Sequence, residues 1–475
     1  MENENNQETI ITEDIDATMR WFHKNLAIGT NFDMLYREMI IGGRKSCVYF
    51  IDGFCKDELM QKMLQYFLSI KKEEFPETAR EMCISFMPYV EVELQKDKEV
   101  ILKNIFSGVL ALFIDGFEEC ILIDSRTYPL RSVSEPEKDK TLRGSKDGFV
   151  ETVIFNTALI RRRIRDRELR IEILNAGKAS KTDIVLCYMQ GRVNQLFLRD
   201  LKRRISQIKA DALTMNQESL AECIFQKSWF NPFPKFKFTE RPDTAAAQIL
   251  EGNVIVLVDN SPFAMILPVS LLDIVEEADD YYFPPVTGTY LRLARLLIAV
   301  ASFLIPPTFL LFTTHPEWIP QSFAFIGMKE AANIPVFWQF LILELAVDGL
   351  RLAAVNTPNM LSTPLSIMAG LVLGEFSVQS GWFNAEVLLY EAFVAVAGYT
   401  QPSYEFSYAV KFFRILTLAF TALFGIYGYI AGILFLLAAL VWNRTLSNKP
   451  YLYPLFPLNI KKLCRRLFRA RLKNN

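Results

Sequence analysis

Two glutamates inside otherwise apolar segments are the residues of this sequence with the clearest potential for chemistry. Glu375 ends an uncharged run, and Glu391 lies within the run VLLYEAFVAVAGY. Ionisable groups are costly in a bilayer, so such residues are candidates for function. In a ring of identical subunits, both carboxylates would line a cation pathway. The alternative is that each one lies at the end of a span, in headgroup water.

Glu344, Asp348 and Arg351 form a third charged group, inside the apolar segment 334–352. Their spacing of i, i+4 and i+7 places them on one face of a helix. The pattern predicts an interfacial helix, or a helix packed against the mouth of a bundle. Asp348 and Arg351 can also pair at i, i+3. Both an ion vestibule and a structural salt bridge fit these charges.

An arginine-rich segment stands out in the first half of the chain. A helix is predicted over 148–167, beginning near Asp147, whose carboxylate can cap the first amide donors. Cations near a helix C-terminus interact favourably with the helix dipole. We expect either a solvated charged face or a subunit interface with acidic partners, carried by Arg161, Arg162, Arg163 and Arg165.

The sequence lacks the usual signatures of catalysis and metal binding. Its two histidines, His23 and His315, lie far apart, and its seven cysteines form no C-x-x-C pair. This pattern predicts free thiols in a reducing compartment and disfavours a zinc site. The chain also has no P-loop, G-x-G-x-x-G or G-x-S-x-G motif. We therefore predict no catalytic site, no metal, no cofactor and no enzymatic activity.

Two long uncharged segments predict membrane spans. The chain is 51% hydrophobic, and residues 296–314 contain no charge, so the first span is expected at 292–314. Arg292 and Arg295 precede it, which indicates entry from the cytoplasm. The last span is expected at 414–442. A straight helix of that length would be about 43 Å long, against a hydrocarbon core of about 30 Å. It must tilt, break near Gly425, Gly428 or Gly432, or project from the bilayer.

Two shorter spans are expected at 363–381 and 386–402, although a core helix of a soluble domain is the competing interpretation. Four spans complete a transmembrane domain over 291–444 and return the tail, 445–475, to the cytoplasm. The bases of this tail predict an anchor on anionic lipid: Lys461, Lys462, Arg465, Arg466 and Arg469.

The region before the spans predicts an α/β fold. Short β-branched runs, such as CVYFI (47–51) and VIVLV (254–258), alternate with helical patterns. The polar stretch around 130–148 separates two expected subdomains, 20–132 and 140–285. Residues 1–18 are acidic and expected to be disordered. They lack a basic and apolar signal pattern, so we expect no cleaved signal peptide and a cytoplasmic location for this region. The net charge of −1 and the membrane spans argue against a nucleic-acid partner.

Eight distinctive segments follow one another along the chain: RGSKDGFVE (143–151), NTALIRRRI (156–164), GKASKTDIVLCY (177–188), NPFPKFKFTERPD (231–243), LEGNVIVLVDNSPFAMILP (250–268), DDYY (279–282), HPEWIP (315–320) and PYLYPLFP (450–457). Together they resemble the A-subunit family of GerA-type spore germinant receptors from endospore-forming bacteria. The segments around 334–359 and 369–405 are most similar to the stage V sporulation branch of this family. Leu352 and the triplet Ser447, Asn448 and Lys449 depart from its receptor branch.

The resemblance implies a role in germination and a location in the inner membrane of the spore. It also implies a homo-oligomeric ring around an ion-conducting path, with a further small membrane subunit as a candidate partner. On this basis we expect an ion-channel subunit that releases monovalent cations. The alternatives are a secondary transporter and a non-conducting sensory or scaffold subunit of a germination complex.

Overall fold

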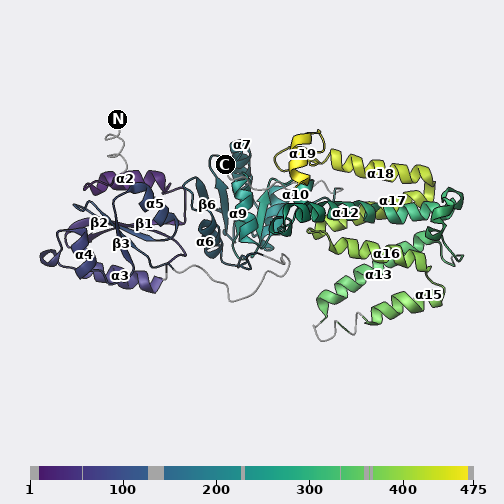
Figure 1. Ribbon diagram of the computed structural model, residues 1–475, viewed down its shortest axis with the longest axis horizontal. Coiled ribbons are helices and arrows are strands. Elements are labelled where there is room, and N and C mark those ends of the chain that lie inside the picture. Colours follow the sequence, from purple (N-terminus) through teal and green to yellow (C-terminus); the bar gives the residue numbers. More distant parts are fainter. Residues whose placement is uncertain are drawn as a thin grey trace. The chain divides into compact units, whose positions relative to one another are not determined.

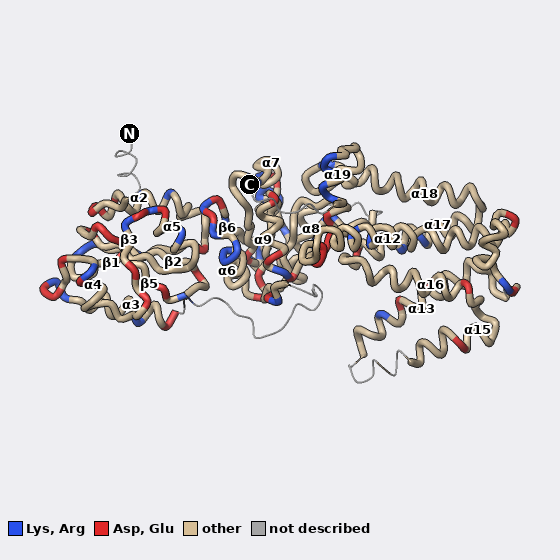
Figure 2. The backbone as a smooth tube through the Cα atoms, viewed as in Figure 1, with Lys and Arg blue, Asp and Glu red and all other residues tan. Residues whose placement is uncertain are grey.

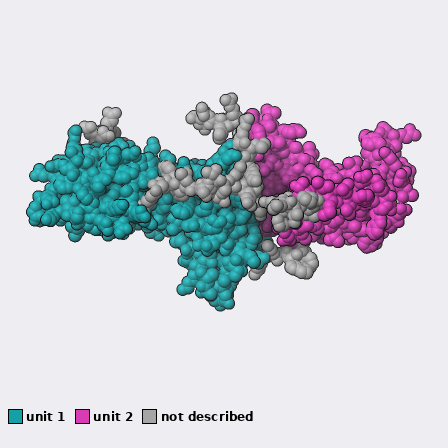
Figure 3. Space-filling view, turned by 90° about the horizontal axis from the view of Figure 1, so that it is seen from below, with its two compact units in different colours: residues 1–226, 238–268 teal, residues 227–237, 269–475 magenta. Residues whose placement is uncertain are grey.

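The computed structural model describes residues 10–55, 57–126, 144–225, 231–331, 333–357, 363 and 367–468. The chain divides into two compact units, shown in different colours in Figure 3. Unit 1 consists of residues 1–226 and 238–268, and unit 2 of residues 227–237 and 269–475. An α/β region with two sheets is thus followed by a mostly helical region, as the sequence predicts.

The first sheet of unit 1 has five strands in the order β1-β2-β4-β5-β3, with antiparallel neighbours. Helices cover both of its faces. Alternate residues of β4 reach opposite cores: Ala111 and Phe113 pack with α2 and α5, whereas Leu112 packs with α3 and α4. The elements are α2 (Ile15–Asn25), β1 (Met34–Ile41), β2 (Arg44–Ile51), α3 (Asp57–Ser69), α4 (Ala79–Ser85), β3 (Val92–Gln95), α5 (Lys98–Phe106), β4 (Leu110–Ile114) and β5 (Cys120–Ile123).

The second sheet has the order β6-β7-β9-β10-β8, and its strand β9 is buried along its whole length. Figure 1 shows α6 and α9 packed beside it. The elements are α6 (Val153–Arg163), β6 (Leu169–Ala176), β7 (Thr182–Met189), α7 (Gln195–Ser206), α8 (Asn216–Ile224), β8 (Lys237–Thr239), α9 (Pro242–Leu250), β9 (Val254–Val258) and β10 (Ala264–Leu267).

The acidic N-terminus and the end of the second subdomain differ from expectation. Residues 1–9 lie outside the described residues, but α2 begins at Ile15, within the segment 1–18 that we expected to be disordered. The Asp14 carboxylate caps this helix, and Ile15 and Met19 enter the core. Residues from Val269 onwards belong to unit 2, so the α/β region ends before the expected residue 285.

Unit 2 is built from apolar helices. Among the described residues, α12 (Pro285–Thr314) and α17 (Tyr404–Phe424) are long and apolar enough to cross a membrane. The shorter apolar helices are Ile367–Gln379 and α18 (Ile426–Val441), and α18 carries no charged residue (Figure 2). The other helices described in unit 2 are α10 (Leu271–Val275), α11 (Asp279–Tyr282), η2 (Pro316–Trp318), η3 (Gln321–Ile326), α13 (Val336–Asn356), η4 (Leu371–Phe376), α15 (Ser377–Gln379), α16 (Ala385–Tyr399) and α19 (Ile460–Leu467).

The expected single span 414–442 is two helices in the structure. The chain breaks at Gly425, whose φ of 56° lies in the region that favours glycine, and α17 already begins at Tyr404. α18 then folds back along α17. A Cβ on Gly428 would lie 1.8 Å from the Phe420 carbonyl oxygen, and one on Gly432 would lie 2.6 Å from the Thr417 side chain. These two glycines therefore permit the close contact between α17 and α18.

The other two expected short spans correspond to the helix Ile367–Gln379 and to α16. Residues 364–366, within the expected span 363–381, lie outside the described residues. The π-helical stretch η4 carries Glu375. The segment 334–352 forms α13, whose N-terminal half packs on α12 and α16 through Phe340 and Leu343.

A buried ion pair joins the two halves of unit 1. Arg161 on α6 donates from Nε and Nη2 to the two carboxylate oxygens of Asp33, at 3.0 and 3.1 Å. The two side chains are 0% and 1% exposed. Asn31 and Phe32 also bond to the backbone of Ile171 on β6. We expected Arg161 on a solvated charged face or at a subunit interface, but it is buried and paired with an aspartate of its own chain.

We expect Arg161→Met to lower the free energy of unfolding of unit 1 by about 3–5 kcal/mol, because Asp33 would remain buried without a countercharge. Thermal unfolding of the full-length protein in detergent measures the effect. Arg165→Met is the control, because Arg165 is exposed. Adding Asp33→Asn to Arg161→Met should restore part of the loss. Equal melting temperatures for the Arg161 and Arg165 variants would contradict this expectation.

Candidate functional site

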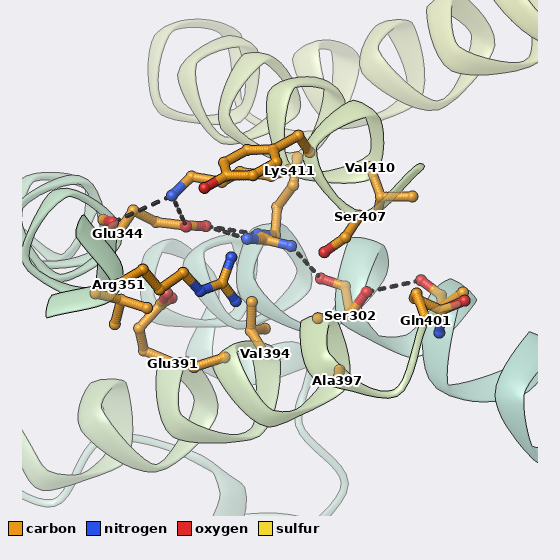
Figure 4. Close-up of a pocket in the computed structure, with 16 residues that line it drawn as sticks. Ser302, Glu344, Arg351, Glu391, Val394, Ala397, Gln401, Ser407, Val410 and Lys411 are labelled. Atoms are coloured by element: carbon orange, nitrogen blue, oxygen red, sulfur yellow. Dashed lines mark hydrogen bonds and ion pairs between the residues drawn. The ribbon is translucent and has the colours of Figure 1, made fainter. Parts of the chain in front are cut away.

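A small cavity lies among α12, α13, α16 and α17, within unit 2 (Figure 4). Its volume is about 20 Å³, which is room for one water molecule. Its charged lining comes from α13, α16 and α17 and consists of Glu344, Arg351, Glu391, Lys411 and Arg414. Its uncharged polar lining consists of Ser302 on α12, Gln401, Ser407 and Tyr408.

Glu344 is the centre of the ion pairs around this cavity. Its Oε1 accepts from Arg414 Nε at 2.7 Å, and its Oε2 lies 3.0 Å from Lys411 Nζ. Dashed lines in Figure 4 mark its contact with Lys411. Lys411 also pairs with Asp348 at 2.6 Å, and Arg414 donates to the Ser302 carbonyl at 3.3 Å. Buried charges persist only when they are paired in this way, so the cluster holds α13 against α17.

Glu391 differs from the other carboxylates of the cluster because it forms no ion pair with the described residues. Its side chain projects from α16 into the cavity lining and is 3% exposed. Its Oε2 atom accepts no hydrogen bond from the residues that the structure describes. Glu344, Arg414 and Lys411 line the same cavity. A buried polar atom without a partner is costly, which marks this carboxyl group as a candidate for function.

Arg351 does not form the pair with Asp348 that helical spacing allows. Its guanidinium lies 4.6 Å from the centre of the Tyr399 ring, and its Nε donates to the Tyr399 hydroxyl at 3.2 Å. It packs so closely on Gly398 that a Cβ there would lie 2.9 Å from Nη2. Arg351 therefore ties α13 to α16, while Asp348 ties α13 to α17.

Glu375 lies outside this cluster. It is exposed on η4 and accepts from Gln379 Nε2 at 3.1 Å. The structure thus brings Glu344, Asp348 and Glu391 together and leaves Glu375 apart. Lys411 and Arg414 are not among the site residues that we predicted from the sequence. A signal for them was present, because they are two bases spaced i, i+3 inside a long apolar helix.

A second charged cluster surrounds the start of α12. Arg292 lies 2.9 Å from Glu276 and 3.2 Å from Asp280, and Arg295 lies 2.8 Å from Asp280. Burial raises the pKa of Glu276, while the Arg292 guanidinium opposes the rise. The two arginines that we used as a topology signal are thus buried in ion pairs.

The basic tail is only partly available to lipid. Helix α19 presents Lys461, Lys462 and Arg465 at the surface. Arg466, however, lies 2.6 Å from Asp273 and 3.3 Å from Glu276 of the same unit. Arg466 is therefore a structural residue, contrary to its expected role as a lipid anchor, because acidic partners already neutralise it. Arg469 lies outside the described residues.

The remaining arginines of α6 differ in exposure. Arg163 pairs with Asp147 at 2.6 Å and donates to Ser145, Arg162 is half-buried, and Arg165 is exposed. Of the four expected interface residues, Arg165 is the one with an exposed side chain. Within the described parts of the chain, no group of three or more His, Cys, Asp or Glu residues is arranged to hold a metal ion.

We expect Glu344→Gln to destabilise unit 2 by roughly 3 kcal/mol, because Arg414 would lose its carboxylate partner while buried. The melting temperature in detergent should fall clearly. Glu375→Gln is the matched control, since it removes an exposed carboxylate and should leave the melting temperature near that of the wild type. A control variant that melts as early as Glu344→Gln would overturn the assignment.

Comparison with known proteins identifies the family. The family model described as "Bacillus/Clostridium GerA spore germination protein" matches residues 22–475. Stage V sporulation protein AF of Bacillus subtilis (strain 168) is 35% identical over 451 residues, covering 95% of this chain and 91% of that protein. Spore germination protein KA of the same organism is 28% identical over 460 residues, covering 94% of this chain and 84% of that protein.

One solved structure of another protein matches part of this chain. It is the N-terminal domain of the A subunit of the Bacillus megaterium spore germinant receptor GerK3, with 22% sequence identity and a TM-score of 0.41. The match covers 54% of this chain and 96% of that one. The family match spans nearly the whole sequence, including the apolar helices of unit 2. The chain is therefore a spore germination membrane protein and belongs to the GerA family.

Proposed function

We propose that this protein is a subunit of a membrane complex that conducts monovalent cations during spore germination. The observation that carries the proposal is the buried Glu391 carboxyl group, which has an unpartnered oxygen beside a cavity among apolar helices. An ionisable group in such surroundings is expensive to keep, and it is typical of ion pathways. Membership of a germination family supplies the physiological setting.

The carboxylates of unit 2 have different roles in this proposal. Glu344 and Asp348 are neutralised by Arg414 and Lys411, and they hold the helices in place. Glu391 is left to act on a passing ion. Glu375 is exposed on a single subunit, so it would reach a pathway only where subunits meet.

The proposal includes a homo-oligomeric ring in the inner spore membrane, with the α/β region in the cytoplasm. A further small membrane subunit is the candidate partner. Lys461, Lys462 and Arg465 on α19 would contact anionic lipid. The proposal assigns no catalysed reaction, cofactor or nucleic-acid partner to the chain.

We expect purified protein in planar bilayers, with or without a co-expressed partner subunit, to pass K⁺ in preference to Cl⁻. Glu391→Gln should lower this preference by roughly tenfold or more, because one charge a few ångströms from an ion contributes more than about 1.4 kcal/mol. The permeability ratio follows from the reversal potential under a KCl gradient.

The matched control is Glu386→Gln, which removes a carboxylate from the first turn of the same helix and outside the cavity lining. Its permeability ratio should equal that of the wild type. No conductance in any of these preparations would refute the channel. Conductance with an unchanged ratio in Glu391→Gln would refute only the assignment of Glu391.

A secondary transporter is the second candidate, because the cavity lies inside one subunit and α17, one of the helices that line it, is interrupted at Gly425. Interrupted helices near a central site are a feature of transporters. Flux that saturates with substrate ion and depends on a second ion gradient would favour it over the channel.

A further inference from the structure

Residues 231–237, here named the strap, belong to unit 2, although residues 1–226 and 238–268 belong to unit 1. The strap is the first part of the NPFPKFKFTERPD motif, and its last residue, Lys237, is the first residue of β8 in the second sheet. It packs against α17 and against the segment that follows α18. Nothing in the proposed conduction path explains why this segment is embedded among apolar helices.

Phe233 is the main apolar contact of the strap with α17. Its ring stacks on Phe413 with centroids 5.3 Å apart and an interplanar angle of 19°. It also lies 6.3 Å from Phe406 and 6.2 Å from Tyr451. Phe233 is 3% exposed, so its ring is fully committed to these contacts. Aromatic pairs of this geometry stabilise a fold by more than the free energy expected from the apolar area that they bury.

Hydrogen bonds fix the strap on either side of Phe233. Asn231 donates from Nδ2 to the Ala439 carbonyl at 3.2 Å. The hydroxyl of Tyr451, a fully buried residue of the PYLYPLFP motif, donates to the Pro234 carbonyl at 2.8 Å. Lys235 donates to the Arg444 carbonyl and lies over the Tyr451 ring at 5.2 Å.

The strap also reaches the charged cluster at the start of α12. Lys237 Nζ donates to the carbonyls of Asp273 and Glu276, at 2.8 and 2.6 Å. Burial lowers the pKa of Lys235 to about 8, a sign of how far this segment is withdrawn from water. The strap is thus anchored at several points along its length.

We propose that Phe233 is a positioning residue for the charge cluster and acts through Phe413. Phe413 directly precedes Arg414 and lies two residues after Lys411 on α17. One side of α17 is therefore held by the strap, and another by the ion pairs with Glu344 and Asp348. Removing the Phe233 ring would leave a cavity beside Phe413, and α17 would relax into it.

The consequence is a physical connection between the α/β region and the charge cluster. A change in the second sheet can act on the strap because Lys237 is the last residue of the strap and the first residue of β8, and the strap acts on α17. This role of Phe233 in conduction rests on the proposed function, whereas its role in holding α17 does not.

The experiment uses the full-length protein reconstituted in bilayers and compares Phe233→Ala with Phe412→Ala. Phe412 is the matched control, because it adjoins Phe413 on α17 but is 55% exposed. Phe233→Ala should change the single-channel conductance or the K⁺/Cl⁻ permeability ratio by about threefold or more, as expected for residues coupled by contact. Phe412→Ala should leave both unchanged, and Phe233→Tyr, which keeps the ring, should restore them.

A double-mutant cycle then tests whether Phe233 acts on the charge cluster through Phe413. If Phe233 acts through Phe413, the change caused by Phe233→Ala should largely disappear in a Phe413→Ala background. Full additivity of the two changes would overturn the route. A Phe233→Ala protein that only assembles fewer channels, each with wild-type conductance and ion preference, would overturn the positioning role.

Hydrogen exchange separates this inference from the proposed function. In Phe233→Ala, amides of α17 and α13 near Lys411 and Glu344 should exchange at least several-fold faster than in Phe412→Ala. This readout needs no conductance, so it remains decisive if the wild-type protein conducts nothing. Exchange rates equal to those of the control would refute the strap as a support of the cluster.

Discussion

The ion pairs between Glu344 on α13 and the bases of α17 are the interaction on which the helical unit depends. Charged groups in an apolar bundle are stable only when they are paired and hydrogen-bonded, so Glu344, Lys411 and Arg414 constrain the helices that carry them. Asp348 extends the pairing by one helical turn. The geometry of this cluster in turn decides that Glu391, on the neighbouring α16, is left without a partner for one of its oxygens.

The same physical rule organises the α/β unit. Arg161 and Asp33 are both buried, and their bidentate contact links α6 to the segment before β1. Buried charges are also paired at the start of α12, where Arg292 and Arg295 form ion pairs with Glu276 and Asp280. Several charged side chains that the sequence would assign to solvent, lipid or another subunit therefore form ion pairs within this chain.

Several motifs that identify the family prove to be structural contacts. The NPFPKFK part of one motif forms the strap, and the PYLYPLFP motif supplies Tyr451, to which the strap bonds. Segments separated by more than two hundred residues thus meet around α17. The structure gives a physical reason for two proline- and aromatic-rich segments whose role hydropathy alone does not explain.

The sequence by itself determined the α/β class of the first region, the apolar helices of the second, and the family. These depend on local periodicity, on composition and on motif order, all of which can be read along the chain. Only the tertiary structure decided which charges are matched. Arg414 meets a carboxylate 70 residues away, and Arg161 meets one 128 residues away. Helical spacing shows which residues share a face of one helix, but the helix opposite that face determines whether Glu391 is unpaired and Glu375 exposed.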